Sequence, residues 1–315
     1  MDTQQFIKSE YDINSYDKLV LDNGLEVLLI ENKSTKKSCT SMIVGAGSFM
    51  DGDVFGLAHL LEHMLFHGNA KYESGDDYFE FINSHGGYTN AFTDTTNTCY
   101  YYTIDNKYLA ESTDMFANFF IKPLFDDKMV TKEIDIIDSE YHKDINSVSY
   151  QYRTAIKLLA HKNHPFREFD VGSHSTLMRK DIRNKLIDFF TKYYIPRNMK
   201  LIILYNSAVS NIRDILLPYA QIGNDATKYI QKNVFGCPFE PGKIIRFVPN
   251  SNGSDVLLLW TIRYDNDYNK FKMMRYIYYL LGRESQNSLI HILLNNSLAD
   301  KLHVQSSMSG NRLSL

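Results

Sequence analysis

The chain is organised around residues 57–68, which read Leu57-Ala58-His59-Leu60-Leu61-Glu62-His63-Met64-Leu65-Phe66-His67-Gly68. On a helix that turns by about 100° per residue, His59 and His63 lie one turn apart, and Glu62 lies on the same face. Two imidazoles at this spacing suit a tetrahedral zinc site, and the adjacent carboxylate can take a proton from water. From this pattern alone, a metal site and a pair of hydrogen-bonded core histidines both stay open.

The composition is that of a globular chain with room for two domains. Its 315 residues are 44% hydrophobic, and its formal net charge is −3. Because there is no basic excess, neither nucleic acid nor an anionic membrane is expected as a partner. The sequence contains no apolar run of about 18 residues and does not begin with a secretory leader, which predicts a cytoplasmic protein.

The cysteines give no metal or disulfide pattern. Cys39, Cys99 and Cys237 are widely spaced, odd in number and without a Cys-x-x-Cys pair. They are therefore interpreted as reduced packing residues.

Strand and helix signals alternate along the chain. Asp22-Asn23-Gly24 between two apolar runs predicts a hairpin over residues 18–31, and residues 39–45 and 98–104 have strand composition. Glycine at Gly86-Gly87, which can take the left-handed C-cap conformation, predicts the end of a helix over 75–84. Apolar spacing predicts helices over 107–121 and 126–160, the last capped by Asp126 or Asp127. Further on, residues 243–248 and 255–262 predict a second hairpin, followed by helices over 268–281 and 285–303.

Several motifs together resemble the insulinase (pitrilysin) family of zinc metallopeptidases, which are inverted zincins with the order His-x-x-Glu-His. In that family a glutamate about 76 residues after the second histidine completes the site, and 76 residues lie between His63 and Glu140. Other matching segments are Asn23-Gly24-Leu25, Gly47-Ser48, Gly56–His59, Gly86–Thr93, His164-Pro165-Phe166 and Tyr194–Met199. A weaker match at Gly282–Leu289 resembles the long insulin-degrading-enzyme branch.

The resemblance implies an α+β fold with two layers, a mostly antiparallel sheet and helices packed on one of its faces. Residues 1–17 are then an N-terminal lead-in, residues 18–231 the zinc-binding catalytic domain, and residues 232–315 part of a second insulinase-like domain. The family's distal half has no counterpart in this sequence, so the chain is expected to be truncated at its C-terminal side.

The resemblance also assigns the metal site. His59, His63 and Glu140 are expected to bind one Zn²⁺, which leaves the fourth position for water. Glu62 is expected to act as general base, and Glu133, two helical turns before Glu140, is expected to support the site. Taken alone, either Glu133 or Glu140 is more readily interpreted as a solvated carboxylate on the surface of a helix than as part of a metal site. His67 is left out of the ligand set because the family has no histidine there.

Substrate-binding residues follow from the same resemblance. Asn90, Ala91 and Phe92 match the edge strand that pairs with the peptide backbone in the family. Phe66, Phe92 and Tyr150 are candidate walls of the pocket next to the zinc. The alternative for these aromatic residues is an ordinary place in the hydrophobic core.

Three functions stay open from the sequence. The first is a zinc endopeptidase that acts on peptides or small proteins, either alone, as a homodimer, or with a separate chain that carries the C-terminal half. The second is a weak or inactive family member that binds peptides, because the distal half is missing. The third is an unrelated helical protein with a fortuitous motif.

Overall fold

The Asn-Gly turn joins the first two strands, as the sequence predicts. The structure is a computed structural model that describes residues 6–206, 209, 212–223, 236–248, 254–263, 273–305, 307–309 and 312–314. Strands Ser15–Val20 (β1) and Glu26–Glu31 (β2) pair antiparallel across the turn. Gly24 has a φ of +90°, a conformation that favours glycine. The Asn23 side chain accepts from Leu25 N at 3.1 Å, which fixes the turn locally.

The remaining elements follow in chain order. They are β3 (Lys37–Val44), α1 (Leu57–Met64), α2 (Gly75–Ser84), β4 (Tyr88–Thr93), β5 (Thr98–Asp105), α3 (Leu109–Ile121), α4 (Asp127–Asp144), α5 (Val148–Leu159), α6 (His174–Leu177), α7 (Ile182–Tyr193), β6 (Met199–Tyr205), β7 (Thr261–Arg263), α9 (Met273–Gly282), α10 (Leu289–Asn295), β8 (Ser307–Ser309) and β9 (Arg312–Ser314). The predicted helix over 126–160 is thus two helices, α4 and α5.

The chain divides into two compact units. The first unit comprises Met1–Ser147 and Glu168–Lys232, and the second comprises Val148–Arg167 and Asn233–Leu315. Helix α5 therefore belongs to the second unit, although the segments on both sides of residues 148–167 belong to the first.

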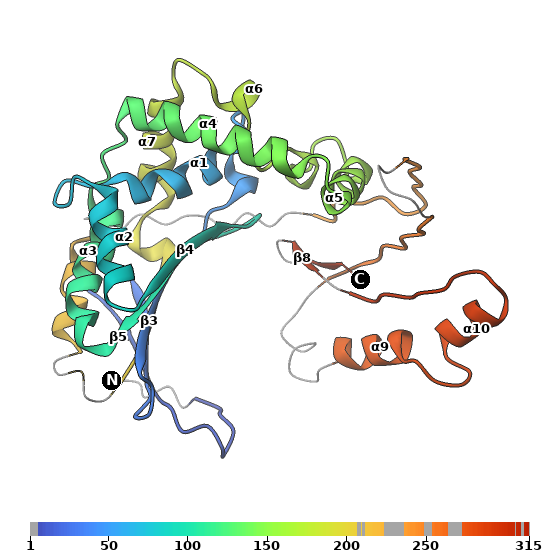
Figure 1. Cartoon of the computed structure of the whole chain (residues 1–315), viewed down its shortest axis with the longest axis horizontal. Coiled ribbons are helices and arrows are strands. Elements are labelled where there is room, and N and C mark those ends of the chain that lie inside the picture. The colour runs from blue at the N-terminus through green and yellow to red at the C-terminus, as the bar shows by residue number, and fades with distance from the viewer. Residues whose placement is uncertain are drawn as a thin grey trace. The chain divides into compact units, whose positions relative to one another are not determined.

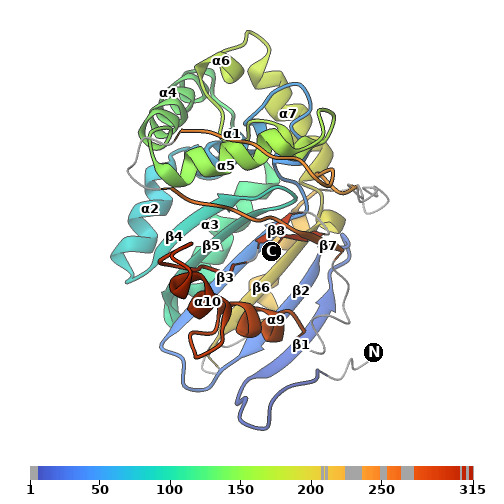
Figure 2. The same cartoon turned by 90° about the vertical axis from the view of Figure 1, so that its right-hand side faces the viewer.

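A six-stranded sheet organises the first unit (Figure 2). The strand order is β1-β2-β6-β3-β5-β4. Only β2 and β6 run parallel, and the other neighbours are antiparallel. The mostly antiparallel α+β sheet predicted from the sequence is confirmed, and β4 forms one of its two edges.

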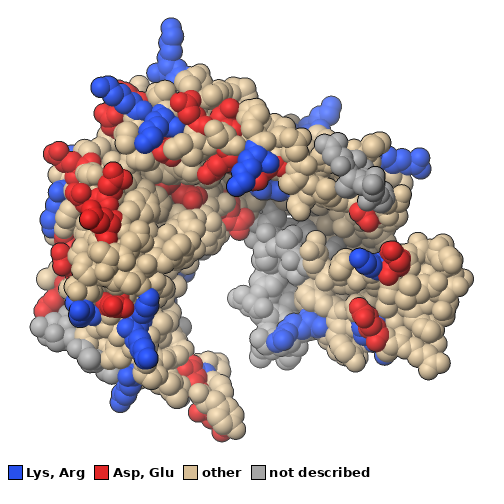
Figure 3. All heavy atoms as spheres, in the orientation of Figure 1, with Lys and Arg blue, Asp and Glu red and all other residues tan. Residues whose placement is uncertain are grey.

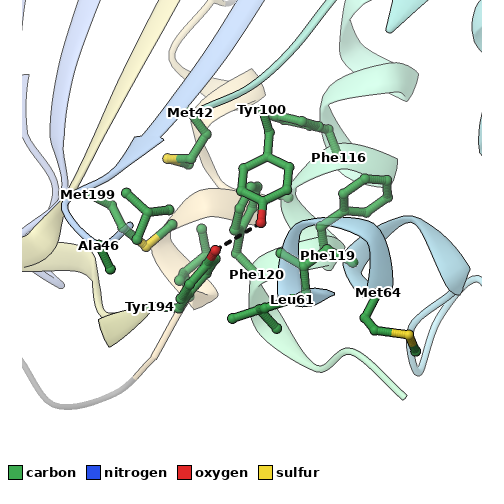
Figure 4. Packing of buried hydrophobic residues seen from close by; sticks show 14 of the residues in the cluster. Met42, Ala46, Leu61, Met64, Tyr100, Phe116, Phe119, Phe120, Tyr194 and Met199 are labelled. Atoms are coloured by element: carbon green, nitrogen blue, oxygen red, sulfur yellow. Dashed lines mark hydrogen bonds between the residues drawn. The ribbon is translucent and has the colours of Figure 1, made fainter. Parts of the chain in front are cut away.

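Helices cover one face of this sheet (Figure 1). Tyr100 and Tyr102 of β5 point to this face, where their rings lie 5.4 Å from Phe120 and 5.1 Å from Phe116 of α3. The Tyr100 hydroxyl also forms a 2.8 Å hydrogen bond with the Tyr194 hydroxyl (Figure 4). The expected second layer of helices is therefore present, and its core is rich in aromatic rings.

Helix α1 is buried on its apolar side. Leu60, Leu61 and Met64 are at most 1% exposed and belong to the core cluster, in which Figure 4 labels Leu61 and Met64. The side chains of His59 and His63 retain 20% and 19% exposure on the opposite side. Burial of the leucine face thus fixes the rotation of α1, and the histidines face away from the core.

The second unit departs from the sequence prediction. Residues 243–248 and 254–260 have no regular secondary structure, so the predicted hairpin is wrong. Within the described residues, only Thr261–Arg263 (β7) forms a strand in this region, and it pairs with β9 in a sheet of order β7-β9-β8. Val248 and Val256 are 94% and 88% exposed. A segment with strand composition forms a strand only when it pairs with another strand, and among the described residues these two segments have no such partner.

Charged side chains of both signs are mixed over the face of the molecule that Figure 3 displays. Among the described residues, no helix combines the length and the apolar character needed to cross a bilayer.

Candidate metal centre

A buried carboxylate fixes the start of the metal-site helix. Asp51 is 5% exposed and accepts hydrogen bonds from Gly56 N and Ala58 N, both at 2.8 Å. Burial raises the pKa of Asp51 to about 7, although these two backbone N–H groups oppose the rise. The first amides of a helix have no partner within the helix, so Asp51 satisfies two of them and holds the turn that precedes His59.

A close backbone approach lies at the same turn. Gly56 has a φ of +88°, and a Cβ on it would lie 2.4 Å from Gly172 Cα. Only glycine fits here. The contact brings the loop that contains Val171 against the first turn of α1.

Each imidazole of the pair is oriented through its Nδ1. His59 Nδ1 lies 2.7 Å from the carbonyl oxygen of Val171, which can only accept a hydrogen bond. His63 Nδ1 lies 2.8 Å from Glu133 Oε2. With the proton on Nδ1, the lone pair of each Nε2 is free for a metal ion.

The charge of Glu133 supports this tautomer of His63. Burial raises the pKa of Glu133, but the hydrogen bonds from His63 and His67 lower it by more, to about 2. For His63, burial lowers the pKa, but the Glu133 hydrogen bond and the charge of Glu140 raise it above the ordinary value. Protons and a metal ion therefore compete for the same His63 nitrogen.

Helix α4 brings the third ligand. Glu140 Oε2 lies 3.9 Å from both His59 Nε2 and His63 Nε2, and the three ligand atoms lie within 4.8 Å of one another. Ligands of a tetrahedral zinc lie about 3.3–3.5 Å apart, so these three atoms lie slightly farther apart than the ligands of a bound zinc would. Two nitrogens and one oxygen fit a zinc ion with an open fourth position. Among the residues that the structure describes, no other group of three potential ligands meets in this way.

The start of α4 depends on Asp126, which accepts from Lys128 N at 3.0 Å and Met129 N at 3.1 Å. We expect Asp126→Ala to lower the free energy of unfolding by about 1 kcal/mol, because both amides lose their cap. Asp127→Ala is the matched control, because the Asp127 side chain lies at the surface, in a 3.6 Å ion pair with Arg183, and caps no backbone amide among the described residues. Urea unfolding of the two variants measures the difference, and equal losses would contradict the capping role.

Glu62 lies beside the histidines on α1 and is 7% exposed. Burial raises its pKa, whereas a hydrogen bond from Thr93 and the charges of His59 and His63 oppose the rise. Thr93 Oγ1, at the end of β4, donates to Glu62 Oε2. A carboxylate with a raised pKa is a stronger base, and the threonine holds one of its oxygens in place.

Asp51 and Thr93 make polar contacts at the site that were not expected from the sequence. Thr93 could have been found because it ends the predicted edge strand. His67, which was left out of the predicted ligand set, has its Nε2 2.7 Å from Glu133 Oε1. Its ring therefore contacts the residue that orients His63.

The predicted substrate-binding residues lie in different settings. Asn90, Ala91 and Phe92 lie on the edge strand β4, and Phe92 is 50% exposed. The Phe66 ring packs 5.3 Å from Phe119 and 5.4 Å from Phe79, which gives it a place at the border of the core. Tyr150 lies on α5 in the second unit. The substrate-binding roles of these five residues stay predictions.

The family model, the related sequences and the solved structure that match this chain agree with one another. Residues 26–162 match the family described as Insulinase (Peptidase family M16). Insulin-degrading enzyme-like 2 of Arabidopsis thaliana is 32% identical over 92% of this chain, and the protein named "Putative zinc protease mug138" of Schizosaccharomyces pombe is also 32% identical over 92%. The crystal structure of pitrilysin is similar over 99% of this chain, with a TM-score of 0.81 and 25% identity.

The matched proteins are much longer than this sequence. The chain spans 31% of the length of the Arabidopsis and Schizosaccharomyces relatives and 35% of the pitrilysin chain.

Proposed function

The chain belongs to the insulinase family of peptidases, and from this premise we propose that it is a zinc-dependent endopeptidase that hydrolyses peptides or small proteins. One observation carries the proposal. The ligand atoms of His59, His63 and Glu140, which come from two helices, converge within 4.8 Å, and the Nδ1 atom of each histidine has a hydrogen-bond partner.

Each residue of the site would have a separate role in peptide hydrolysis. His59, His63 and Glu140 would hold the ion, which when bound supplies a water of pKa near 7 and a charge that polarises the scissile carbonyl. Glu62 takes the proton from the attacking water and delivers it to the leaving amine. Glu133 keeps His63 in the tautomer that ligates.

The edge strand β4 provides a place for the substrate. Thr93 of β4 contacts Glu62, so the strand ends next to the general base. An extended peptide that pairs with the open edge of β4 would run toward the metal ligands. Backbone pairing binds many sequences, and exposed side chains such as Phe92 select among them.

Metal removal tests the proposal. We expect the purified chain to bind about one zinc and to cleave an internally quenched fluorescent peptide, because the three ligands leave one position for water. EDTA should abolish the cleavage, and added zinc should restore it. Cleavage that is insensitive to EDTA would contradict the proposal. Zinc and peptide binding without cleavage would instead support a non-catalytic peptide-binding protein.

A further inference from the structure

Glu133 is held between two imidazoles. Its Oε2 lies 2.8 Å from His63 Nδ1, and its Oε1 lies 2.7 Å from His67 Nε2. The glutamate is 3% exposed, so solvent has little access to either oxygen. Each carboxylate oxygen thus has its own histidine partner.

The second partner restricts the carboxylate more than the first one alone. A glutamate side chain turns about three bonds, so one hydrogen bond leaves its carboxylate plane free to rotate. A second hydrogen bond, on the other oxygen, fixes that plane. It also satisfies a buried acceptor that would otherwise lack a partner, which typically costs about 1–3 kcal/mol.

The local backbone directs His67 to Glu133. Helix α1 ends at Met64, and Leu65–His67 continue as a 3-10 turn. Residues of a 3-10 helix advance by about 20° more each than those of an α-helix, so His67 leaves the row of His59 and His63. The chain then turns at Gly68, whose φ is +105°.

We propose that His67 is a positioning residue for the metal site, which acts through Glu133 to hold His63 ready for zinc. This inference rests on the proposed function. It adds a residue that contacts neither the ion nor the substrate. Its effect passes through a chain of two hydrogen bonds, from His67 to Glu133 and from Glu133 to His63.

Zinc affinity tests this role without any need for peptidase activity. We expect His67→Leu to weaken zinc binding about tenfold in competition with a chromophoric chelator, the lower end of the typical effect of an outer partner. His67→Gln should bind zinc nearly as tightly as the unchanged chain, because its amide nitrogen can replace Nε2 as donor. His85→Leu is the matched control: His85 is also half-buried, but it contacts Phe81 and Tyr108.

A double-mutant cycle separates positioning from general damage to the fold. In a Glu133→Gln background, His67→Leu should cause much less further loss of zinc affinity, because its effect passes through Glu133. An unchanged affinity in His67→Leu, or the same loss with and without Glu133, would overturn the inference. Failure of the unchanged chain to bind zinc would instead overturn the proposed function.

Discussion

Glu62→Gln is expected to lower kcat for peptide hydrolysis by about 10²–10⁴-fold, while about one zinc per chain stays bound. Glutamine has the shape of glutamate but cannot take a proton from water. Its side-chain oxygen can still accept the hydrogen bond that Thr93 donates to Glu62. The fold and the metal ligands should therefore persist while proton transfer is lost.

Steady-state kinetics on the fluorescent peptide, with the zinc content of the same samples, measure this effect. Glu80→Gln is the matched control, because Glu80 is an exposed residue of α2 and should leave kcat unchanged. Equal rates in Glu62→Gln and the unchanged chain would exclude Glu62 as general base. Loss of zinc from Glu62→Gln would assign the residue to metal binding instead.

Glu140→Gln is expected to weaken zinc binding by more than about 100-fold. Removing an outer hydrogen-bond partner of a ligand typically weakens metal binding about 10–100-fold, and changing a direct ligand should weaken it more. The carboxylate is the charged ligand among the three, and its Oε2 lies 3.9 Å from both imidazole nitrogens. A neutral amide of the same size donates less electron density to the ion. Hydrolysis should fall with the zinc content.

Competition with a chromophoric chelator measures the zinc affinity of this variant. Asp144→Asn is a suitable control, because it removes one charge from an exposed residue at the end of the same helix. If Glu140→Gln bound zinc as tightly as Asp144→Asn, Glu140 would be a solvated helix carboxylate, the ordinary alternative.

The cluster of His59, His63 and Glu140 could be predicted because its signals are local or depend on a fixed interval. His59 and His63 share a face by helical spacing alone. Glu140 was placed by an interval that the insulinase family repeats, and the structure brings its carboxylate to the two histidines. The hairpin at Gly24 and the limits of α2 at residues 75–84 also followed from turn and cap residues.

Glu133 was expected to support the site, but the other residues that orient its side chains were not predictable in the same way. Thr93 contacts Glu62 from 31 residues away, and Val171 contacts His59 from 112 residues away. Such pairs arise from tertiary packing and leave no periodic pattern in the sequence. His67 does continue the spacing on α1, but its partner Glu133 becomes visible only when α1 and α4 pack together.

The hairpin over 243–262 was predicted from two apolar runs on either side of a turn and is wrong for a related reason. An apolar run shows that a segment can form a strand, but pairing decides whether it does. Thr261–Arg263 (β7) pairs with Arg312–Ser314, about 50 residues later, and not with residues 243–248. The exposed apolar side chains of residues 254–260 therefore lie outside any strand.

We propose that His59, His63 and Glu140 share one zinc ion. Anomalous diffraction at the zinc edge, from crystals of the zinc-loaded chain, would locate that ion. We expect one peak about 2.0–2.2 Å from His59 Nε2, His63 Nε2 and a Glu140 carboxylate oxygen. A peak at any other residues, or one that Glu140 does not reach, would contradict the claim.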